Sequence, residues 1–556
     1  MSENGRISRV LGNIGHGGHA LADDVEGAEK LVADREDLNT LSAVALSAPA
    51  GKVATTSFGY LFPRLAAGFP DHHLPQGDRV GVVVRALDAL GEAMVEQPVA
   101  GVPAGSPIPP VYTYWGQFVD HDLVLATDGD TRISITGDVL DPEPPTAVVA
   151  ALANTRTPAL NLDSVYGEGP FDASRKVPYD GIKLALGELT PVAVGEPVPP
   201  ADDAARDLPR DADRVARIGD GRNDENLFVA QLHVAFLRFH NAAVDWVRAG
   251  EPERVTDVEV FLRARELTRW TYQWLVVHDY LRTVARPDVV DEVETDDANL
   301  LDATDERPVV FMPVEFAAAG FRFGHSMVRA GYDWNRNFGR PGSAGATFVQ
   351  LFQFTGGSQD PIGGLDLPTL PANWPVEWDR MVDKDSPFPD RFARRIDTRI
   401  APPLTDMINQ GTDPALPERV RGLLKHLARR NLLRGYRLAV PCAQAVAQEL
   451  GVPVLTREEL ERGLPDHART LAGEAGLLER TPLWFYVLKE AEVQEDGARL
   501  GRVGSRVVAE TIIGQIRRDP GSYLHRTSWS PAQGVRLPDG GEIRTIAAFL
   551  RFAGVL

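Results

Sequence analysis

The sequence contains a single cysteine, Cys442, among its 556 residues. One cysteine excludes an intrachain disulfide and any metal cage built from several thiolates. The sequence also lacks an uninterrupted apolar run of about 18 residues, which is the length that a membrane-spanning helix needs. We therefore predict a protein without a membrane span and without a cysteine-based metal site.

Basic residues are also in short supply, because 58 Lys and Arg stand against 78 Asp and Glu, for a formal net charge of −20. Nucleic acids are bound by basic faces, and no basic run of that kind is present, so we exclude a nucleic-acid partner. The N-terminus, MSENGRISRVLGNIGHGGHALADD, lacks the charged and then apolar stretch of a secretory signal. We expect a cytoplasmic protein, although export by a route without such a signal would also fit.

The remaining composition is typical of a large globular enzyme, with 43% hydrophobic and 24% charged residues. Residues 1–39 are Gly-rich and acidic and are predicted to form an N-terminal extension, with one large domain over residues 40–556. Strand patterns are few, as at Val309–Met312, and no internal repeat is visible. These features predict a mainly α fold. Its clearest helical periods cover residues 224–248, 257–285, 314–330, 417–436, 441–450 and 503–518.

The segment Tyr112–Leu123, YTYWGQFVDHDL, carries the most informative pattern. Gln117, Asp120 and His121 are spaced i, i+3 and i+4, so on a helix they share one face. Asp122 is turned about 100° from His121 around the helix axis. One short helix can therefore present an amide, a carboxylate and an imidazole to a pocket. A lone histidine on such a helix is more often a packed core residue, and that interpretation stays open here.

Two further segments carry charged and imidazole side chains at helical spacing. In Asp220–Ala249, Arg222 and Glu225 are three residues apart at a helix entrance and can face one cavity, although an acidic first turn is also favoured by the helix dipole. In Val314–Tyr332, Arg322 and His325 are one turn apart, as an arginine for a carboxylate and a histidine for an iron would be. The alternative is a core helix with a stray histidine.

The segment Thr157–Gly167, TPALNLDSVYG, places oxygen-bearing residues at alternating positions. The side chains of Thr157, Asn161 and Asp163 and the carbonyl of Ala159 form the kind of oxygen set that calcium prefers. Taken alone the pattern is weak, because turns rich in Asn and Asp are common.

Together these motifs resemble the peroxidase–cyclooxygenase superfamily, the animal-type haem peroxidases, and specifically its bacterial branch. WGQFVDHDL resembles the distal motif, GDGRNDENLFVAQLHVAFLRFHN the catalytic-arginine helix, FRFGHSMV the proximal-histidine helix and TPALNLDSVYG the calcium loop. Further likeness in ARRNLLRGYRLAVP, TPLWFYVLKEAEV and LGRVGSRVVAE extends it over roughly residues 55–555. The resemblance implies one large, mainly α domain with haem b buried between central helices and few short strands.

The resemblance also implies a role for each matching residue. On the distal side, His121 would transfer protons, Gln117 would order water or halide, and Arg222 would stabilise charge on bound peroxide. On the proximal side, His325 would bind iron and Arg322 would pair with a haem propionate. Asn431, in the less specific ARRNLLRG match, would be hydrogen-bonded to His325.

Asp120 and Glu225 match the carboxylates that form esters with haem methyl groups in this family. Asn226 stands where some relatives carry a sulfonium-forming methionine, so a third haem link is excluded. Calcium would be held by Asp122, Thr157, the Ala159 carbonyl, Asn161 and Asp163. Asn161 and Asp163 stand where relatives carry Asp and Ser, which preserves the charge of the site. Because Asp122 follows His121, calcium loss is expected to disturb the distal histidine.

The implied activity is reduction of hydrogen peroxide, through an oxyferryl haem, coupled to oxidation of halide, thiocyanate or phenols, with a role in the response to oxidative stress. An alternative is a fatty-acid dioxygenase on the same fold, which needs a tyrosyl radical near the haem. Tyr272, Tyr280 and Tyr332 are its candidates, and the sequence places none of them. A third alternative is a haem and calcium scaffold without turnover, against which the complete set of distal and proximal residues argues.

Overall fold

The computed structural model describes residues 56–97, 105–128, 134–137, 140–193, 203–295, 300–301, 311–339, 345–355, 367–408 and 410–556. The predicted extension over residues 1–39, with its boundary, lies outside the described residues. The prediction of a mainly α fold in one large domain is confirmed. The longer helices are α5 (Val80–Ala93), α6 (Pro110–Leu123), α9 (Leu227–Gly250), α10 (Asp257–Leu275), α12 (Pro287–Thr295), α17 (Glu418–Lys425), α18 (Leu427–Arg437), α21 (Asp466–Ala475), α22 (Leu483–Glu495) and α23 (Arg502–Arg518).

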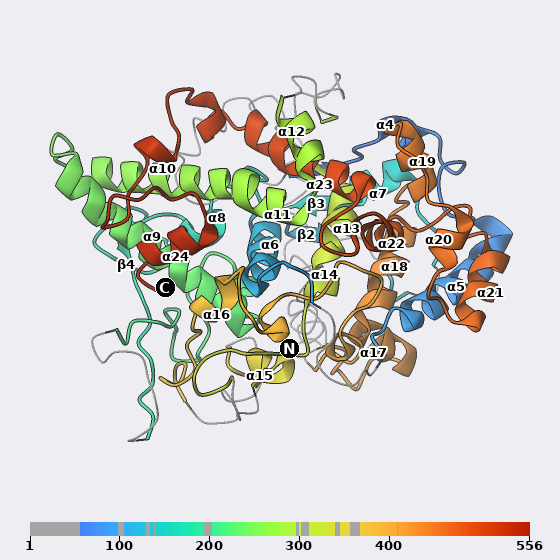
Figure 1. Cartoon of the computed structure of the whole chain (residues 1–556), viewed down its shortest axis with the longest axis horizontal. Helices are drawn as coiled ribbons and strands as arrows, with labels where there is room; N and C mark the ends of the chain where they lie inside the picture. The colour runs from blue at the N-terminus through green and yellow to red at the C-terminus, as the bar shows by residue number, and fades with distance from the viewer. Residues whose placement is uncertain are drawn as a thin grey trace.

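Shorter helices connect these and shape the interior. They are α4 (Pro63–Ala67), α7 (Pro145–Ala151), α8 (Asp163–Tyr166), α11 (Arg282–Val284), α13 (Val314–Ala318), α14 (Gly324–Met327), α15 (Phe348–Gln353), α16 (Asp379–Val382), α19 (Ala443–Glu449), α20 (Arg457–Glu461) and α24 (Ile546–Phe552). Figure 1 shows α6 near the centre of the molecule, with α9 and α10 on one side and α18 and α22 on the other. The centre of the fold is therefore the helix with the most informative motif.

A small sheet joins the segments that flank this centre. Its strand order is β2 (Ala126–Asp128), β3 (Leu152–Asn154), β1 (Thr56–Gly59) and β6 (Phe311–Pro313). β1 and β6 are parallel, with Ser57 opposite Phe311, and the other pairs are antiparallel. Two-stranded ribbons form from β4 (Tyr179–Asp180) with β5 (Lys183–Leu184), and from β7 (Gly331–Tyr332) with β8 (Ala346–Thr347). Since β2 follows α6 and β6 leads into α13, the four-stranded sheet links the two segments that carry the histidine motifs.

Helix α9 is the principal core helix. It is long and apolar enough to cross a membrane by length and composition, but 83% of its most apolar window is buried inside the protein. Its Phe236 stacks on Phe118 of α6, with ring centroids 4.2 Å apart. The sequence of α9 has apolar residues on more than one face, which indicates a buried helix. The packing of α9 against α6 and α10 explains this pattern.

Two of the expected continuous helices are interrupted. The 257–285 period becomes α10, a π-helical turn η5 (Val276–Leu281) and α11. The 314–330 period becomes α13, the 3₁₀ turn η6 (Gly320–Phe323) and α14, because Ala319 has a non-helical φ of −139° and ψ of −68°. A side chain at Gly320 would lie 2.7 Å from Val507, so this turn needs glycine to approach α23. Residues of both interrupted segments, such as Tyr280 of η5 and Arg322 of η6, line one internal cavity. π-helical turns are frequent at functional sites of proteins.

Glu315 connects α13 to the segment after β1. Its carboxylate is completely buried and accepts hydrogen bonds from the backbone amides of Leu61, at 2.9 Å, and Phe62, at 3.2 Å. Burial raises the pKa of Glu315 to about 7, although these two amide hydrogen bonds lower it. The folded protein therefore binds a proton at Glu315 over a pH range in which the unfolded chain has already released it.

A Glu315→Gln variant should consequently gain stability, relative to the wild type, as pH rises. The raised pKa makes the wild type lose free energy of unfolding between about pH 4.5 and about pH 7, by at most about 3 kcal/mol, whereas glutamine does not ionise. Melting temperatures at about pH 5 and about pH 8 measure the effect, with the exposed Glu458→Gln on α20 as the control. If the melting temperatures of the Glu315→Gln variant and the wild type differed equally at both pH values, the raised pKa of Glu315 would be contradicted.

Candidate active site

The distal helix α6 exposes one face to an internal cavity. Pro110 occupies the first helical turn, where its missing amide proton is not needed, and the helix ends before Val124, which is extended. Thr113, Gly116, Gln117 and Asp120 line the cavity, at the spacing of one helix face. The cavity encloses about 740 Å³ of space free of protein atoms, part of which is open to solvent.

The opposite wall of the cavity comes from η6 and α14. Arg322 and His325 line it, so four of the predicted site residues, two distal and two proximal, meet at one cavity. Tyr280 of η5, Asn226, which is the N-cap residue of α9, and Tyr112 and Tyr114 of α6 add further polar groups to the lining. The remaining lining is largely apolar and includes Phe321, Phe323, Val328, Phe348, Phe352, Leu404 and Leu427.

His121 is fully buried on α6 next to the cavity-lining Asp120. Its Nδ1 lies 2.8 Å from Asn223 Oδ1, and Asn223 Nδ2 lies 3.0 Å from His233 Nδ1. Burial lowers the pKa of His233 to about 3, so this neutral ring accepts the amide proton. The Asn223 oxygen then accepts from His121 Nδ1–H. This arrangement leaves the lone pair of His121 on Nε2, as a proton-accepting group requires.

Arg222 lies at the entrance to α9, in the turn η4 (Gly221–Asp224). Its Nε and Nη2 donate to the Asp220 carboxylate, at 3.1 and 2.7 Å, and Nη2 also donates to the His121 carbonyl at 2.9 Å. Burial would raise the pKa of Asp220, but Arg222 and Arg156 hold it far below its usual value. Arg222 is therefore a fixed cation beside the backbone of His121. It is not among the residues that line the cavity.

Gln117 is held in place by two neighbours. Its amide nitrogen donates to Glu225, and its oxygen accepts from Asn226 Nδ2 at 3.1 Å. Glu225 is buried behind Gln117 and does not line the cavity, whereas Asp120 does. The structure therefore separates the two carboxylates that the resemblance pairs as haem-ester residues.

On the proximal side, Asn431 of α18 lies beside His325. The Asn431 amide nitrogen is 2.9 Å from His325 Nδ1. Because half a rotation of the amide exchanges its nitrogen and oxygen, the same contact can accept a proton from Nδ1 when Nε2 binds a metal. The predicted pair is thus brought together by two helices that are about 100 residues apart in the sequence.

Arg430 is a site residue that the sequence reasoning missed. It is buried next to Asn431, and its Nη1 donates to Gln410 at 3.1 Å. Burial and the charge of Arg322 lower the pKa of Arg430 to about 10. Arg322 donates to the Ala317 carbonyl, and burial lowers its pKa as well. Two neighbouring buried cations bonded to neutral groups suit an anionic ligand such as the carboxylates of haem.

Each of the five predicted calcium-binding residues has an oxygen that accepts a hydrogen bond within the protein. Their oxygens are hydrogen-bonded to protein donors as follows: Asp122 to Leu162 N and Ser164 Oγ, the Thr157 carbonyl to Ala159 N, the Ala159 carbonyl to Gln273 Nε2, Asn161 Oδ1 to Asp163 N, and Asp163 Oδ1 to Arg156 Nη1. Among the described residues, no group of three or more His, Cys, Asp or Glu side chains is arranged to hold a metal ion. These hydrogen bonds are the ones that a calcium ion would have to replace, and calcium binding by this loop stays a prediction.

The tyrosine candidates occupy different positions. Tyr280 lines the cavity and lies so close to Gly116 that a side chain at Gly116 would clash with its hydroxyl. Tyr332 accepts a hydrogen bond from Tyr114 at 3.0 Å. Tyr272 packs behind α6, with its ring centroid 5.9 Å from that of Trp115. Only Tyr280 of the three is therefore a wall residue of the cavity.

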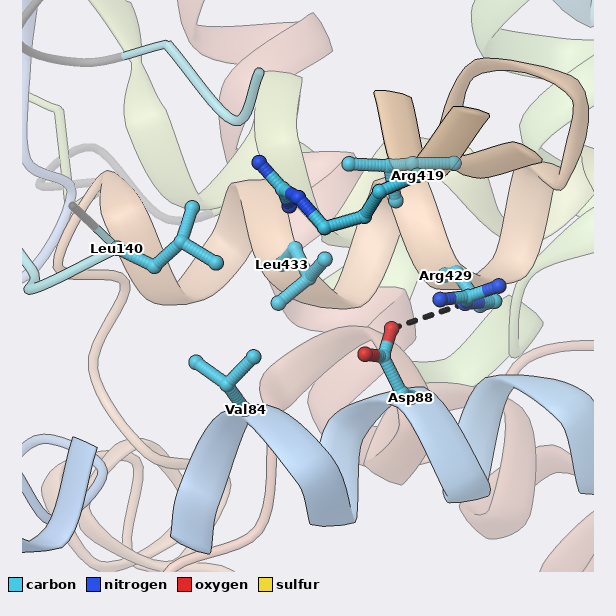
Figure 2. A pocket seen from close by; sticks show the side chains of 7 residues that line it. Val84, Asp88, Leu140, Arg419, Arg429 and Leu433 are labelled. Atoms are coloured by element: carbon cyan, nitrogen blue, oxygen red, sulfur yellow. Dashed lines mark hydrogen bonds and ion pairs between the residues drawn. The ribbon is translucent and has the colours of Figure 1, made fainter. Parts of the chain in front are cut away.

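A second cavity lies between α5, α17 and α18. Figure 2 shows Asp88 facing Arg429, with which it forms an ion pair at 2.9 Å. Val84, Leu140 and Leu433 supply aliphatic walls. It holds neither a histidine nor a second carboxylate among its lining residues. We therefore place the reaction in the cavity between α6 and α14.

Comparisons with known proteins give one matching family and several similar folds. Residues 145–344 match the family model described as animal haem peroxidase. No curated protein sequence matches the chain. Among solved structures, peroxidase A from Dictyostelium discoideum is similar with a TM-score of 0.51 and 15% identity, over 85% of this chain and 88% of that one. The fatty acid alpha-dioxygenase of Oryza sativa is similar with a TM-score of 0.51 and 15% identity, over 78% and 72%.

Proposed function

The chain belongs to the animal-type haem peroxidases of the peroxidase–cyclooxygenase superfamily, and we propose that it reduces hydrogen peroxide at a buried haem and oxidises small donors. The observation that carries the proposal is the single cavity between Gln117 and Asp120 on one wall and His325 on the other. The neighbouring cations, Arg322 and Arg430, suit haem carboxylates.

The residues divide the work of holding haem. His325 would ligate the iron through Nε2, with Asn431 bonded to Nδ1 to orient the ring. Arg322 and Arg430 would neutralise the propionates, and the apolar lining would exclude water. The bound haem would supply the redox chemistry, which protein side chains alone cannot provide.

On the distal side, His121 would move the proton. Peroxide must lose a proton from one oxygen and gain one on the other, and a neutral imidazole can do both. Asn223 keeps the Nδ1 proton in place, so Nε2 is the acceptor. Arg222, fixed by Asp220 next to the His121 backbone, provides positive charge that favours the developing anion. Gln117 would order the water or donor beside His121.

Steady-state oxidation of iodide, thiocyanate and a phenol tests the proposal. We expect peroxide-dependent oxidation of at least one of these donors by the haem-loaded protein, and none by the protein without haem. Full haem loading with no oxidation of any of the three donors would favour a scaffold without turnover.

A fatty-acid dioxygenase is the second candidate, because Tyr280 lies in the wall of a cavity with a largely apolar lining. The Oryza sativa dioxygenase also shares the fold. Oxygen uptake with palmitic acid and with an unsaturated fatty acid separates the two functions. Uptake that is lost in a Tyr280→Phe variant would support the dioxygenase. Donor oxidation that persists in this variant, without oxygen uptake, would support the peroxidase.

Covalent haem attachment is a separate expectation, and the structure makes it asymmetric. Asp120 lines the cavity, whereas Glu225 is bonded to Gln117 behind it. After peroxide treatment we expect part of the haem to stay with the protein during acid–acetone extraction. Asp120→Asn should release this fraction, and the matched Glu225→Gln should release less. Complete extraction from the treated wild type, or the reverse order of the two variants, would contradict the expectation.

A further inference from the structure

Arg156 is a buried cation within the loop that resembles a calcium site. It is 7% exposed, its Nη1 donates to Asp163 Oδ1 at 3.0 Å, and its Nη2 lies 2.5 Å from Asp220 Oδ2. Nη2 also donates to the Gly219 carbonyl at 3.4 Å. One guanidinium therefore joins the loop to the segment that precedes the α9 helix.

Carboxylates surround this guanidinium. Asp163 and Asp220 each form an ion pair with Arg156. Asp122, which is fully buried on α6, accepts hydrogen bonds from Leu162 N and Ser164 Oγ, each at 3.2 Å. The loop is thus attached to α6 by these hydrogen bonds and to residues 219–220 by Arg156.

We propose that the Arg156 guanidinium is the resident cation of this loop, so that the protein holds its distal helix without calcium. A guanidinium offers several donors in a fixed plane and can bridge two carboxylates, as a metal ion would. A calcium ion beside Asp163 would be repelled by Arg156. The ion would also have to displace the protein donors that are already hydrogen-bonded to the oxygens of the loop. The proposal does not depend on which reaction the cavity performs.

The arrangement also links the loop to the active site. Asp220 is shared between Arg156 and Arg222, and Arg222 donates to the His121 carbonyl. Arg156 is therefore a positioning residue for Arg222. Its effects must be measured by readouts other than turnover.

Metal content and thermal stability of the wild-type, full-length protein give the first test. After dialysis against a calcium chelator, we expect far less than one calcium per chain, and the same melting temperature in chelator and in millimolar calcium. One calcium per chain that survives dialysis, or a melting temperature that falls by several degrees on chelation, would overturn the proposal.

An Arg156→Ala variant gives the second test, with Arg175→Ala, an exposed arginine downstream of the same loop, as the matched control. Removing the guanidinium leaves Asp163 without its cation, so the variant should melt several degrees below the wild type. Millimolar calcium, but not sodium at equal ionic strength, should then raise its melting temperature. Should this variant fail to fold, Arg156→Lys keeps the charge but not the two-carboxylate bridge, and should show a smaller loss. A variant as stable as the wild type would overturn the proposal.

Discussion

Replacing His121 by alanine is expected to slow peroxide turnover by roughly 10²- to 10⁴-fold, which is the usual contribution of a positioned general acid–base group. Haem binding should persist, because the proposed iron ligand is His325 on the opposite wall. The loss arises because no other imidazole replaces His121: His233 is bonded to Asn223 and its pKa is lowered to about 3 by burial. Stopped-flow measurement of the reaction with peroxide gives the rate directly.

The control for this variant is His467→Ala on α21, where the histidine is exposed. It should leave peroxide turnover unchanged. An Asn223→Leu variant should fall between the two, because it keeps His121 but loses the partner that fixes the Nδ1 proton. Full peroxide turnover in His121→Ala would refute the assigned role.

Replacing His325 by glycine is expected to remove ordered haem binding, because this side chain is the only proposed protein ligand to the iron. The Soret band of the variant should be weak or shifted after haem loading. Added imidazole should restore it, since the deleted side chain leaves space for a free ring beside Asn431. Absorption titration with imidazole measures the recovery.

The control is a His426→Ala variant, because His426 caps the α18 helix that also carries Asn431. It should weaken the start of α18 without imidazole-dependent recovery of the Soret band. A His325→Gly variant with a normal Soret band and normal donor oxidation would exclude His325 as the iron ligand.

Local patterns were enough to predict the distal helix and the core helix. The i, i+3, i+4 spacing of Gln117, Asp120 and His121 depends only on helix geometry, and the helix found over Pro110–Leu123 matches it. The wide apolar surface of residues 224–248 likewise predicts burial, because few contexts other than a core stabilise such a helix.

Contacts between distant segments could not be predicted in this way. The hydrogen bond from Arg222 to the His121 carbonyl and the buried position of Arg430 depend on how separate segments pack. The break at Ala319 stands next to Gly320, which closely approaches Val507, nearly 190 residues later in the sequence. Helical periodicity alone gives no sign of either, because it reports one segment at a time.

The loop after β3 shows where the resemblance and the packing differ. Oxygen-bearing residues at alternating positions indicate calcium, yet Arg156, directly before them, brings a cation of its own. The sequence contains this arginine, but its partner Asp220 lies 64 positions later. If Arg156 is the cation of this loop, His121 should depend on Arg156, acting through Asp220 and Arg222.

The absorption spectrum of the purified, haem-loaded protein tests the central claim most directly, when it is recorded alone, with hydrogen peroxide, and with peroxide followed by iodide. We expect a Soret band that changes within seconds of peroxide addition and returns when iodide is added as the electron donor. A Soret band that peroxide leaves unchanged, in a protein with haem fully bound, would contradict the account of His121, Arg222 and His325 as one peroxidase site.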